Sequence, residues 1–235
     1  MKKTLITAAL CMAAPTLADA RTAAADDGFR YTDEQFADIQ MLRYRVDGFE
    51  RLSLREKTFI YYLQEAALSG RDILFDQNGR YNLHIVRLLE AVYTHYRGDR
   101  RSAFFTALTT YLKRVWFSSG IHHHYGCEKF LPEFSADDLR AALAAVPAEA
   151  LPLEKGQTLQ ALCDELFPVM FDPAVMPMRV NQRDGDDLVA TSAANYYAPG
   201  ITQAEAEAFY AQRKAPLDPT PVMTGMNSRL ERDAD

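Results

Sequence analysis

Three consecutive histidines form the segment of this sequence with the clearest capacity for chemistry. They are His122, His123 and His124, within SSGIHHHYG at residues 118–126, and a glycine lies on each side of them. In an extended chain successive side chains alternate between two faces, so His122 and His124 would point the same way and His123 the opposite way. Two imidazoles on one face could contact one metal ion, but a zinc site needs a third protein ligand.

A second interpretation of the same segment needs no metal. Imidazole rings packed beside Trp116 and Tyr125 could act as half-buried hydrogen-bonding groups that contact a polar ligand. The flanking glycines favour this interpretation, because they allow the backbone to turn sharply beside a cleft. The residues alone leave both interpretations open.

The other candidate patterns indicate little chemistry. Neighbouring residues do not face each other on a helix, so Asp137-Asp138 is expected in a first helical turn and Asp186-Asp187 in a solvated loop. No histidine is followed by glutamate, so the H-E-x-x-H zinc helix is absent from the sequence, as are G-x-S-x-G and a glycine-rich phosphate loop. Cys127 follows His124 too closely for a recognisable catalytic pair.

Helices are expected to position most of these residues. Ser53-Leu54-Arg55-Glu56 is a capping box, and the apolar residues that follow it at helical spacing predict a buried helix that ends at Gly70. Similar start signals at Thr32–Gln35, Ser135–Asp138 and Thr202–Glu205 predict helices over 36–44, 139–146 and 206–213. Apolar spacing predicts two more, over 83–96 and 103–117. Helical spacing also predicts that one aromatic series is core: Tyr93, Tyr96, Phe104, Phe105, Tyr111, Trp116 and Phe117.

Extended structure is expected only in short pieces. Residues 76–79 read as a turn, 172–187 as a loop and 188–197 as a possible strand. Residues 226–230 read as the beginning of a strand with nothing after it to pair with. We therefore expect a mainly α fold with minor β (α+β), made of a mostly helical region over 21–215, then a linker and the start of an interrupted β element over 216–235.

The amino terminus predicts export. Residues 1–20 combine Lys2 and Lys3, an apolar stretch and a small-residue cleavage site, which is typical of a signal peptide. Cys11 is a poor lipidation site because the large Leu10 precedes it. The mature protein is expected in the periplasm or secreted, with no membrane contact, because no later stretch is apolar enough to span a bilayer. Cys127 and Cys163 would then remain, either as a disulfide or as two thiols.

Composition and charge exclude other classes. With 48% apolar and 25% charged residues, the 235-residue chain is of ordinary globular composition. Its net charge is −6 at pH 7, and loss of the signal would make it one unit more negative. Nucleic acid is therefore not expected as a partner.

Three long segments resemble one enzyme family. They are residues 33–93, beginning DEQFADIQMLRYRVDGFERLSLREK; residues 111–134, YLKRVWFSSGIHHHYGCEKFLPEF; and residues 224–233, TGMNSRLERD. In this order they resemble the amino-terminal part of dipeptidyl-peptidase III in its bacterial exported form. The resemblance implies a two-lobed zinc exopeptidase that releases dipeptides from the N-terminus of oligopeptides.

The resemblance also implies a division of labour. The family's H-E-x-x-G-H zinc helix is missing from this sequence, so no catalytic residue and no metal ligand are expected here, and zinc is expected only in the complete family enzyme. This chain alone is expected to be inactive and to contribute a substrate-cleft wall. The implied contacts with oligopeptide substrate are His122, His123, His124, Tyr125 and Lys129. The implied protein partner is the remainder of the peptidase chain. The alternative is an exported helical metal-binding or interaction module that uses His122 and His124.

Overall fold

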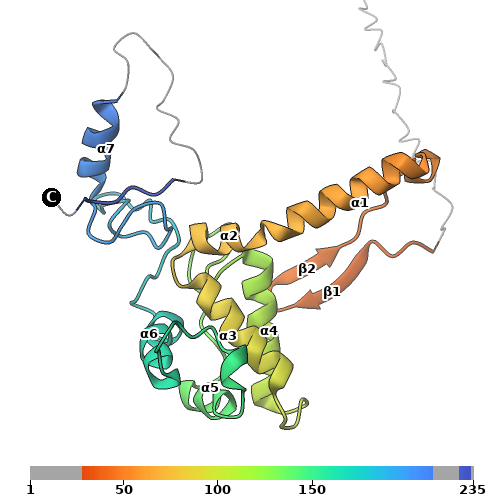
Figure 1. Cartoon of the computed structure of the whole chain (residues 1–235), viewed down its shortest axis with the longest axis horizontal. Coiled ribbons are helices and arrows are strands. Elements are labelled where there is room, and N and C mark those ends of the chain that lie inside the picture. Colours follow the sequence, from red (N-terminus) through yellow and green to blue (C-terminus); the bar gives the residue numbers. More distant parts are fainter. Residues whose placement is uncertain (1–27, 214–227, 234–235) are drawn as a thin grey trace, which may run out of the picture.

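The computed structural model describes residues 28–213 and 228–233. The fold is mainly helical with one small sheet, as expected (Figure 1). The predicted signal peptide and residues 216–227 of the predicted linker lie outside the described residues. The elements in chain order are β1 (Thr32–Phe36), β2 (Ile39–Leu42), a 3-10 turn (Phe49–Arg51), α1 (Leu54–Ser69), α2 (Arg71–Asn78), α3 (Asn82–His95), α4 (Ala103–Ser118), α5 (Ala136–Leu143), a second 3-10 turn (Ala148–Ala150), α6 (Leu159–Phe171) and α7 (Gln203–Ala211).

The core lies where α3 and α4 pack against each other and against α5 and α6. The four helices form the lower part of the molecule in Figure 1. Tyr93 stacks on Phe105 with ring centroids 5.6 Å apart, so the predicted aromatic core is confirmed at this point. Trp116 and Phe117 are exceptions, because both are exposed on the outer side of α4.

The predicted helix over 36–44 is wrong. The chain forms an antiparallel hairpin instead, in which β1 pairs with β2 and Phe36 lies opposite Ile39. Ala37 takes a positive φ of 48° in the turn, a conformation that a helix does not contain. Ion pairs from the hairpin to α4, between Glu34 and Lys113 and between Asp38 and Arg114, fix it against the helical body. These distant partners override the local helix signal.

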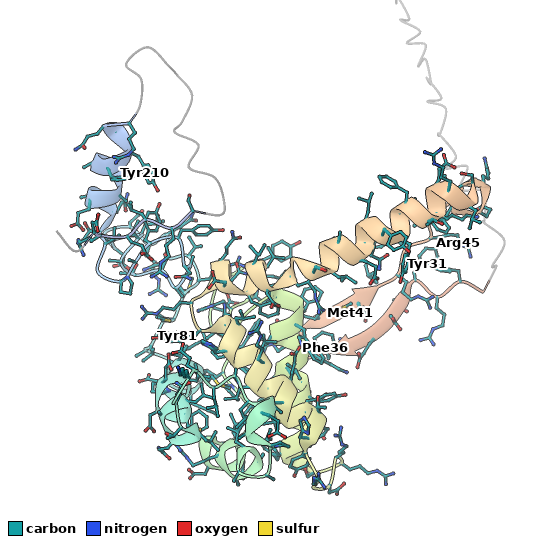
Figure 2. The ribbon with its side chains drawn as sticks, in the orientation of Figure 1. Tyr31, Phe36, Met41, Arg45, Tyr81 and Tyr210 are labelled. Atoms are coloured by element: carbon teal, nitrogen blue, oxygen red, sulfur yellow. The ribbon has the colours of Figure 1, made fainter. Side chains whose placement is uncertain are left out.

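Helix α1 begins where predicted but is not buried. Ser53 Oγ accepts a hydrogen bond from the Glu56 backbone N–H, and the Glu56 carboxylate accepts one from the Ser53 backbone N–H, so the capping box is confirmed. None of the side chains of α1 is buried, which contradicts the expected buried helix. Apolar residues on it stand exposed along an arm that reaches away from the core, as Figure 2 shows. The periodic pattern is present, but no described part of the chain covers it.

The segment after α6 is held by side chains and by isolated backbone pairs, and it forms no regular strand in the part that the structure describes. Residues 172–187 form a loop, as predicted, whereas the predicted strand over 188–197 is a series of turns. Asp187 explains the difference, because its carboxylate accepts hydrogen bonds from the backbone N–H groups of Val189, Ala190 and Gln203. These bonds lower the pKa of Asp187. The sequence predicted a solvated loop residue, but the Asp187 carboxylate also stabilises the turns that follow it.

The carboxyl-terminal piece has a partner after all. Leu230 forms an isolated parallel bridge with Tyr197, in which the Ala198 N–H donates to the Leu230 carbonyl at 2.8 Å. Leu230 thus pairs with an earlier residue of the chain, and the expected lack of a later partner stays a prediction. No helix in the described ranges combines the length and the apolar character needed to cross a membrane.

Candidate functional site

The histidine segment forms one side of a tight reversal rather than an extended strand. The Phe130 N–H donates to the Ile121 carbonyl, and the His123 N–H donates to the Glu128 carbonyl at 2.7 Å. The chain turns back between these pairs, and Cys127 takes a positive φ of 63°. The expected alternation of side chains therefore stops at His123.

Glycine is most strictly required at Gly120, because a Cβ at Gly126 would meet only the flexible, exposed Glu128 carboxylate, which can move away. Gly120 has a φ of 150°, and a Cβ there would collide with the side-chain amide of Asn82. Asn82 is buried, and its Oδ1 accepts the Ile121 N–H, which fixes the entry to the histidine segment. The loop is thereby attached to the start of α3.

His122 is a buried structural residue. Its Nε2 lies 2.9 Å from the Met176 carbonyl, and a carbonyl only accepts, so Nε2 carries the proton. Burial lowers the pKa of His122 to about 4, because the charged imidazolium would lose its hydration. His122 is therefore neutral near pH 7 and ties the loop to the segment after α6.

Lys129 is also engaged internally. Its ammonium donates to the carbonyls of Val169, Asp172 and Val175, around the carboxyl-terminal end of α6. A positive charge is favourable there, because the last carbonyls of a helix lack intrahelical donors. Burial lowers the pKa of Lys129. All three ammonium protons are used, which leaves none for a ligand in this conformation.

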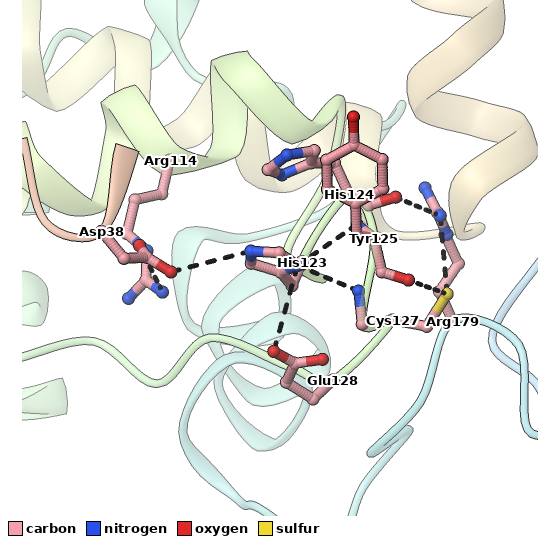
Figure 3. A network of polar contacts seen from close by, with 9 residues as sticks. Asp38, Arg114, His123, His124, Tyr125, Cys127, Glu128 and Arg179 are labelled. Atoms are coloured by element: carbon pink, nitrogen blue, oxygen red, sulfur yellow. Dashed lines mark hydrogen bonds and ion pairs between the residues drawn. The ribbon is translucent and has the colours of Figure 1, made fainter. Parts of the chain in front are cut away.

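His123 is oriented from both sides. Its Nδ1 accepts the backbone N–H groups of Tyr125 and Gly126, at 3.2 and 3.0 Å, so in the neutral ring the proton is on Nε2. Nε2 lies 3.6 Å from the Asp38 carboxylate, which Arg114 also contacts at 3.3 Å. Figure 3 shows this network between the β1–β2 turn, α4 and the loop.

His124 and Tyr125 form the accessible part of the loop. The Tyr125 side chain is 85% exposed, and the His124 ring packs edge-on against Phe117 with centroids 4.8 Å apart. Desolvation, followed by the neighbouring His123, lowers the pKa of His124. Arg179 donates to the His124 carbonyl at 3.0 Å and holds the backbone beneath both residues. The arrangement offers a phenol and a largely neutral imidazole beside an exposed aromatic face.

The five predicted contact residues thus separate into two groups. The structure brings His123, His124 and Tyr125 together, with His123 and His124 ring centroids 4.4 Å apart. It directs the polar atoms of His122 and Lys129 inward. Sequence reasoning missed Asp38, Arg114 and Arg179, whose roles depend on contacts with segments far away along the chain.

The described residues do not fit a zinc site. Within 28–213 and 228–233, no three His, Cys, Asp or Glu side chains come together where they could hold a metal ion. His122 Nε2 donates to Met176, so a metal at His122 would have to bind the buried Nδ1, and no third ligand joins it and His124 among these residues. Cys127 and Cys163 are both free thiols in the structure, which selects the second of the two alternatives for them.

Asp137 and Asp138 lie in the first turn of α5, where Ser135 accepts the Asp138 N–H at 3.0 Å. Ser135 caps the helix, and the two carboxylates occupy its first turn, as expected from the sequence. Comparison with known proteins adds no family assignment: no family model matches the chain, and no curated protein matches it.

Proposed function

We propose that this chain forms a peptide-binding wall of a zinc-dependent dipeptidyl peptidase of the dipeptidyl-peptidase III type. The sequence resemblance over 33–93, 111–134 and 224–233 supports the family. The reaction of that family removes dipeptides from the N-terminus of oligopeptides. We place the zinc ligands and the catalytic base of that enzyme outside this sequence, because the sequence lacks the family's H-E-x-x-G-H motif.

One observation carries the peptide-binding part of this proposal. Tyr125 is almost fully exposed, yet the backbone around it is fixed by His123, Arg179 and the loop pairing. The Tyr125 ring also packs against the His124 ring, with centroids 4.5 Å apart. Such pre-organisation reduces the entropy lost when a ligand binds, which favours a binding role for Tyr125. His124 and Tyr125 would contact the peptide, whereas His122 and Lys129 would position the loop.

The exposed arm supports the proposed protein partner. Exposed apolar side chains on α1 include Phe59, Ile60, Tyr62 and Leu63. Apolar surface of this extent usually marks a contact with another polypeptide segment. The remainder of the peptidase chain is the partner we propose for it.

The alternative function is an exported interaction or metal-binding module. The exposed apolar surface of α1 favours binding to another protein, whichever protein that is. A metal site at His122 and His124 would have to use Nδ1 of His122, which is buried without a hydrogen-bond partner while Nε2 donates to Met176. Titration with zinc separates the two: tight binding with proton release would favour the module, and weak binding would favour the peptide wall.

Peptide titration tests the proposal directly. Unblocked oligopeptides of four to six alanines should bind the chain in calorimetry, and Tyr125→Ala should weaken binding by about tenfold. Tyr44→Ala is the matched control, because Tyr44 is also highly exposed but follows β2 rather than the histidine loop. Equal affinity of the wild type and Tyr125→Ala, or no binding at all, would refute the assignment of the wall.

An activity assay tests where the chemistry lies. The chain with added zinc should not hydrolyse a dipeptidyl-naphthylamide substrate. Robust turnover that a chelator abolishes would show that a catalytic site exists within this sequence and would overturn the proposed division of labour.

A further inference from the structure

A cavity separate from the exposed face of the histidine loop has the chemistry of an anion site. It encloses about 500 Å³ between the α2–α3 link and the turns of 176–201. Arg80, which is partly buried, lines it from the link, and Arg183, which is exposed, lines it from the turns. The two arginines lie far apart in the sequence, and no local pattern predicts that they line the same cavity.

Most of the hydrogen-bonding groups in the wall are already used. Asn181 is buried, and its amide donates to Asp186 at 2.8 Å and to Thr191 at 2.9 Å. The Thr191 hydroxyl donates to the Asp187 carbonyl, and the Ser192 hydroxyl donates to the Leu188 carbonyl. A hydroxyl has one proton, so neither can donate to a ligand at the same time.

Unlike these hydroxyl and amide groups, the two guanidinium groups have no charged partner among the described residues. In the part of the chain that the structure describes, neither Arg80 nor Arg183 forms an ion pair. Nε of Arg80 is fully buried, so only the terminal nitrogens of its guanidinium are available to the cavity. The Arg80 guanidinium lies 4.8 Å from the centre of the Tyr81 ring, which helps to fix its plane. Terminal N–H groups of a guanidinium without an ion-pair partner can donate to a bound oxyanion.

Charge selects the kind of anion. The wall contains Arg80, Arg183 and one carboxylate, Asp186, so its formal charge is positive by one. Alanine and proline side chains make up much of the remaining wall, including Ala193, Ala194 and Pro199. A single carboxylate on a small apolar body matches this combination better than a phosphate dianion, because it neutralises the excess charge and its planar oxygens fit the guanidinium fork.

We propose that this cavity binds the carboxylate of a small ligand through Arg80 and Arg183. The ligand could be a free monocarboxylate or the C-terminal end of a short peptide, since both present the same group. The site does not depend on the proposed peptidase function. Met176 and Pro177 line the cavity and also contact His122 and the Lys129 backbone, so the cavity lies directly behind the histidine loop.

Calorimetry with matched ligands tests the proposal on the wild-type chain. N-acetyl-dialanine should bind, and N-acetyl-dialanine amide, which lacks the carboxylate, should bind at least about tenfold more weakly. If propionate binds as tightly as N-acetyl-dialanine, a free monocarboxylate is sufficient for binding at this site. Equal binding of the acid and the amide, or no binding of the acid, would overturn the proposal. Inorganic phosphate that binds more tightly than the acid would overturn the assignment to a carboxylate.

Variants then place the ligand in this cavity. Arg183→Gln and Arg80→Lys should each weaken binding of N-acetyl-dialanine by about tenfold. The glutamine removes the charge, whereas the lysine keeps the charge but lacks the planar fork of the guanidinium. Arg101→Gln is the control, since Arg101 is exposed outside the cavity. Far-UV circular dichroism of each variant confirms folding. Unchanged affinity in a folded Arg183→Gln variant would refute the site even if the acid binds elsewhere.

Discussion

Nε2 of His123 lies 3.6 Å from the carboxylate of Asp38, and this contact joins the histidine loop to the turn of the β1–β2 hairpin. Arg114 on α4 contacts the same carboxylate from the helical body. The accessible loop is therefore supported by a hairpin that the sequence did not predict. The first experiment concerns this contact.

Asp38→Asn should loosen the hairpin with a small loss of stability. The side chain of Asp38 is about half exposed, so solvent screens its ion pairs, and we expect a loss of about 0.5–1 kcal/mol in the free energy of unfolding. Denaturant unfolding measures this loss. Asp33→Asn, on the exposed side of β1, should leave stability unchanged. An equal effect of both variants would show that the Asp38 contacts add nothing specific.

His122 should make the fold sensitive to mild acid. Its pKa is about 4 in the folded state against about 6.5 in the unfolded chain, so the unfolded chain binds the proton more readily between these values. Stability should fall as pH drops from 6.5 towards 4, by up to about 3 kcal/mol from this group. Denaturant unfolding at several pH values gives the slope.

The variant His122→Phe isolates this contribution, because carboxylates also lose stability in acid. It should be less stable than the wild type at pH 7, but its stability should fall less between pH 6.5 and 4. A wild-type slope in His122→Phe would mean that other groups cause the acid sensitivity.

Lys129→Met should destabilise the end of α6. The change removes the donor to three carbonyls and leaves them around an apolar side chain, which should cost about 2–3 kcal/mol. Thermal and denaturant unfolding measure the loss. Lys155→Met is a matched control, because Lys155 is exposed. A loss for Lys129→Met no larger than that of the control would show that water replaces the ammonium without penalty.

Phe59→Ser should not destabilise the isolated chain, because Phe59 is 63% exposed on α1. Its change in unfolding free energy should stay within about 0.5 kcal/mol, whereas Leu88→Ala in the α3 core should cost about 2–5 kcal/mol. Sedimentation should also show less self-association for Phe59→Ser than for the wild type. A large loss of stability would mean that Phe59 is covered by this chain in solution.

The sequence by itself determined the helices whose signals are local. The Ser53–Glu56 and Thr202–Glu205 capping boxes form as written, and α3 and α4 lie within a residue or two of their predicted bounds. Caps and apolar periodicity act within one or two turns of chain, so reading them needs no knowledge of the rest of the fold. The mainly helical class with minor β follows from the same signals.

Tertiary structure alone decided the rest. The Thr32–Gln35 start signal predicted a helix, but the segment forms a hairpin whose ion pairs reach α4. The apolar pattern of α1 predicted a helix correctly but did not show whether another segment covers it. The three histidines are identical in type, yet His122 turns inward to Met176, His123 contacts Asp38 and His124 lies beside Phe117. Each of these outcomes depends on a partner distant in sequence, and a local pattern does not contain the position of such a partner.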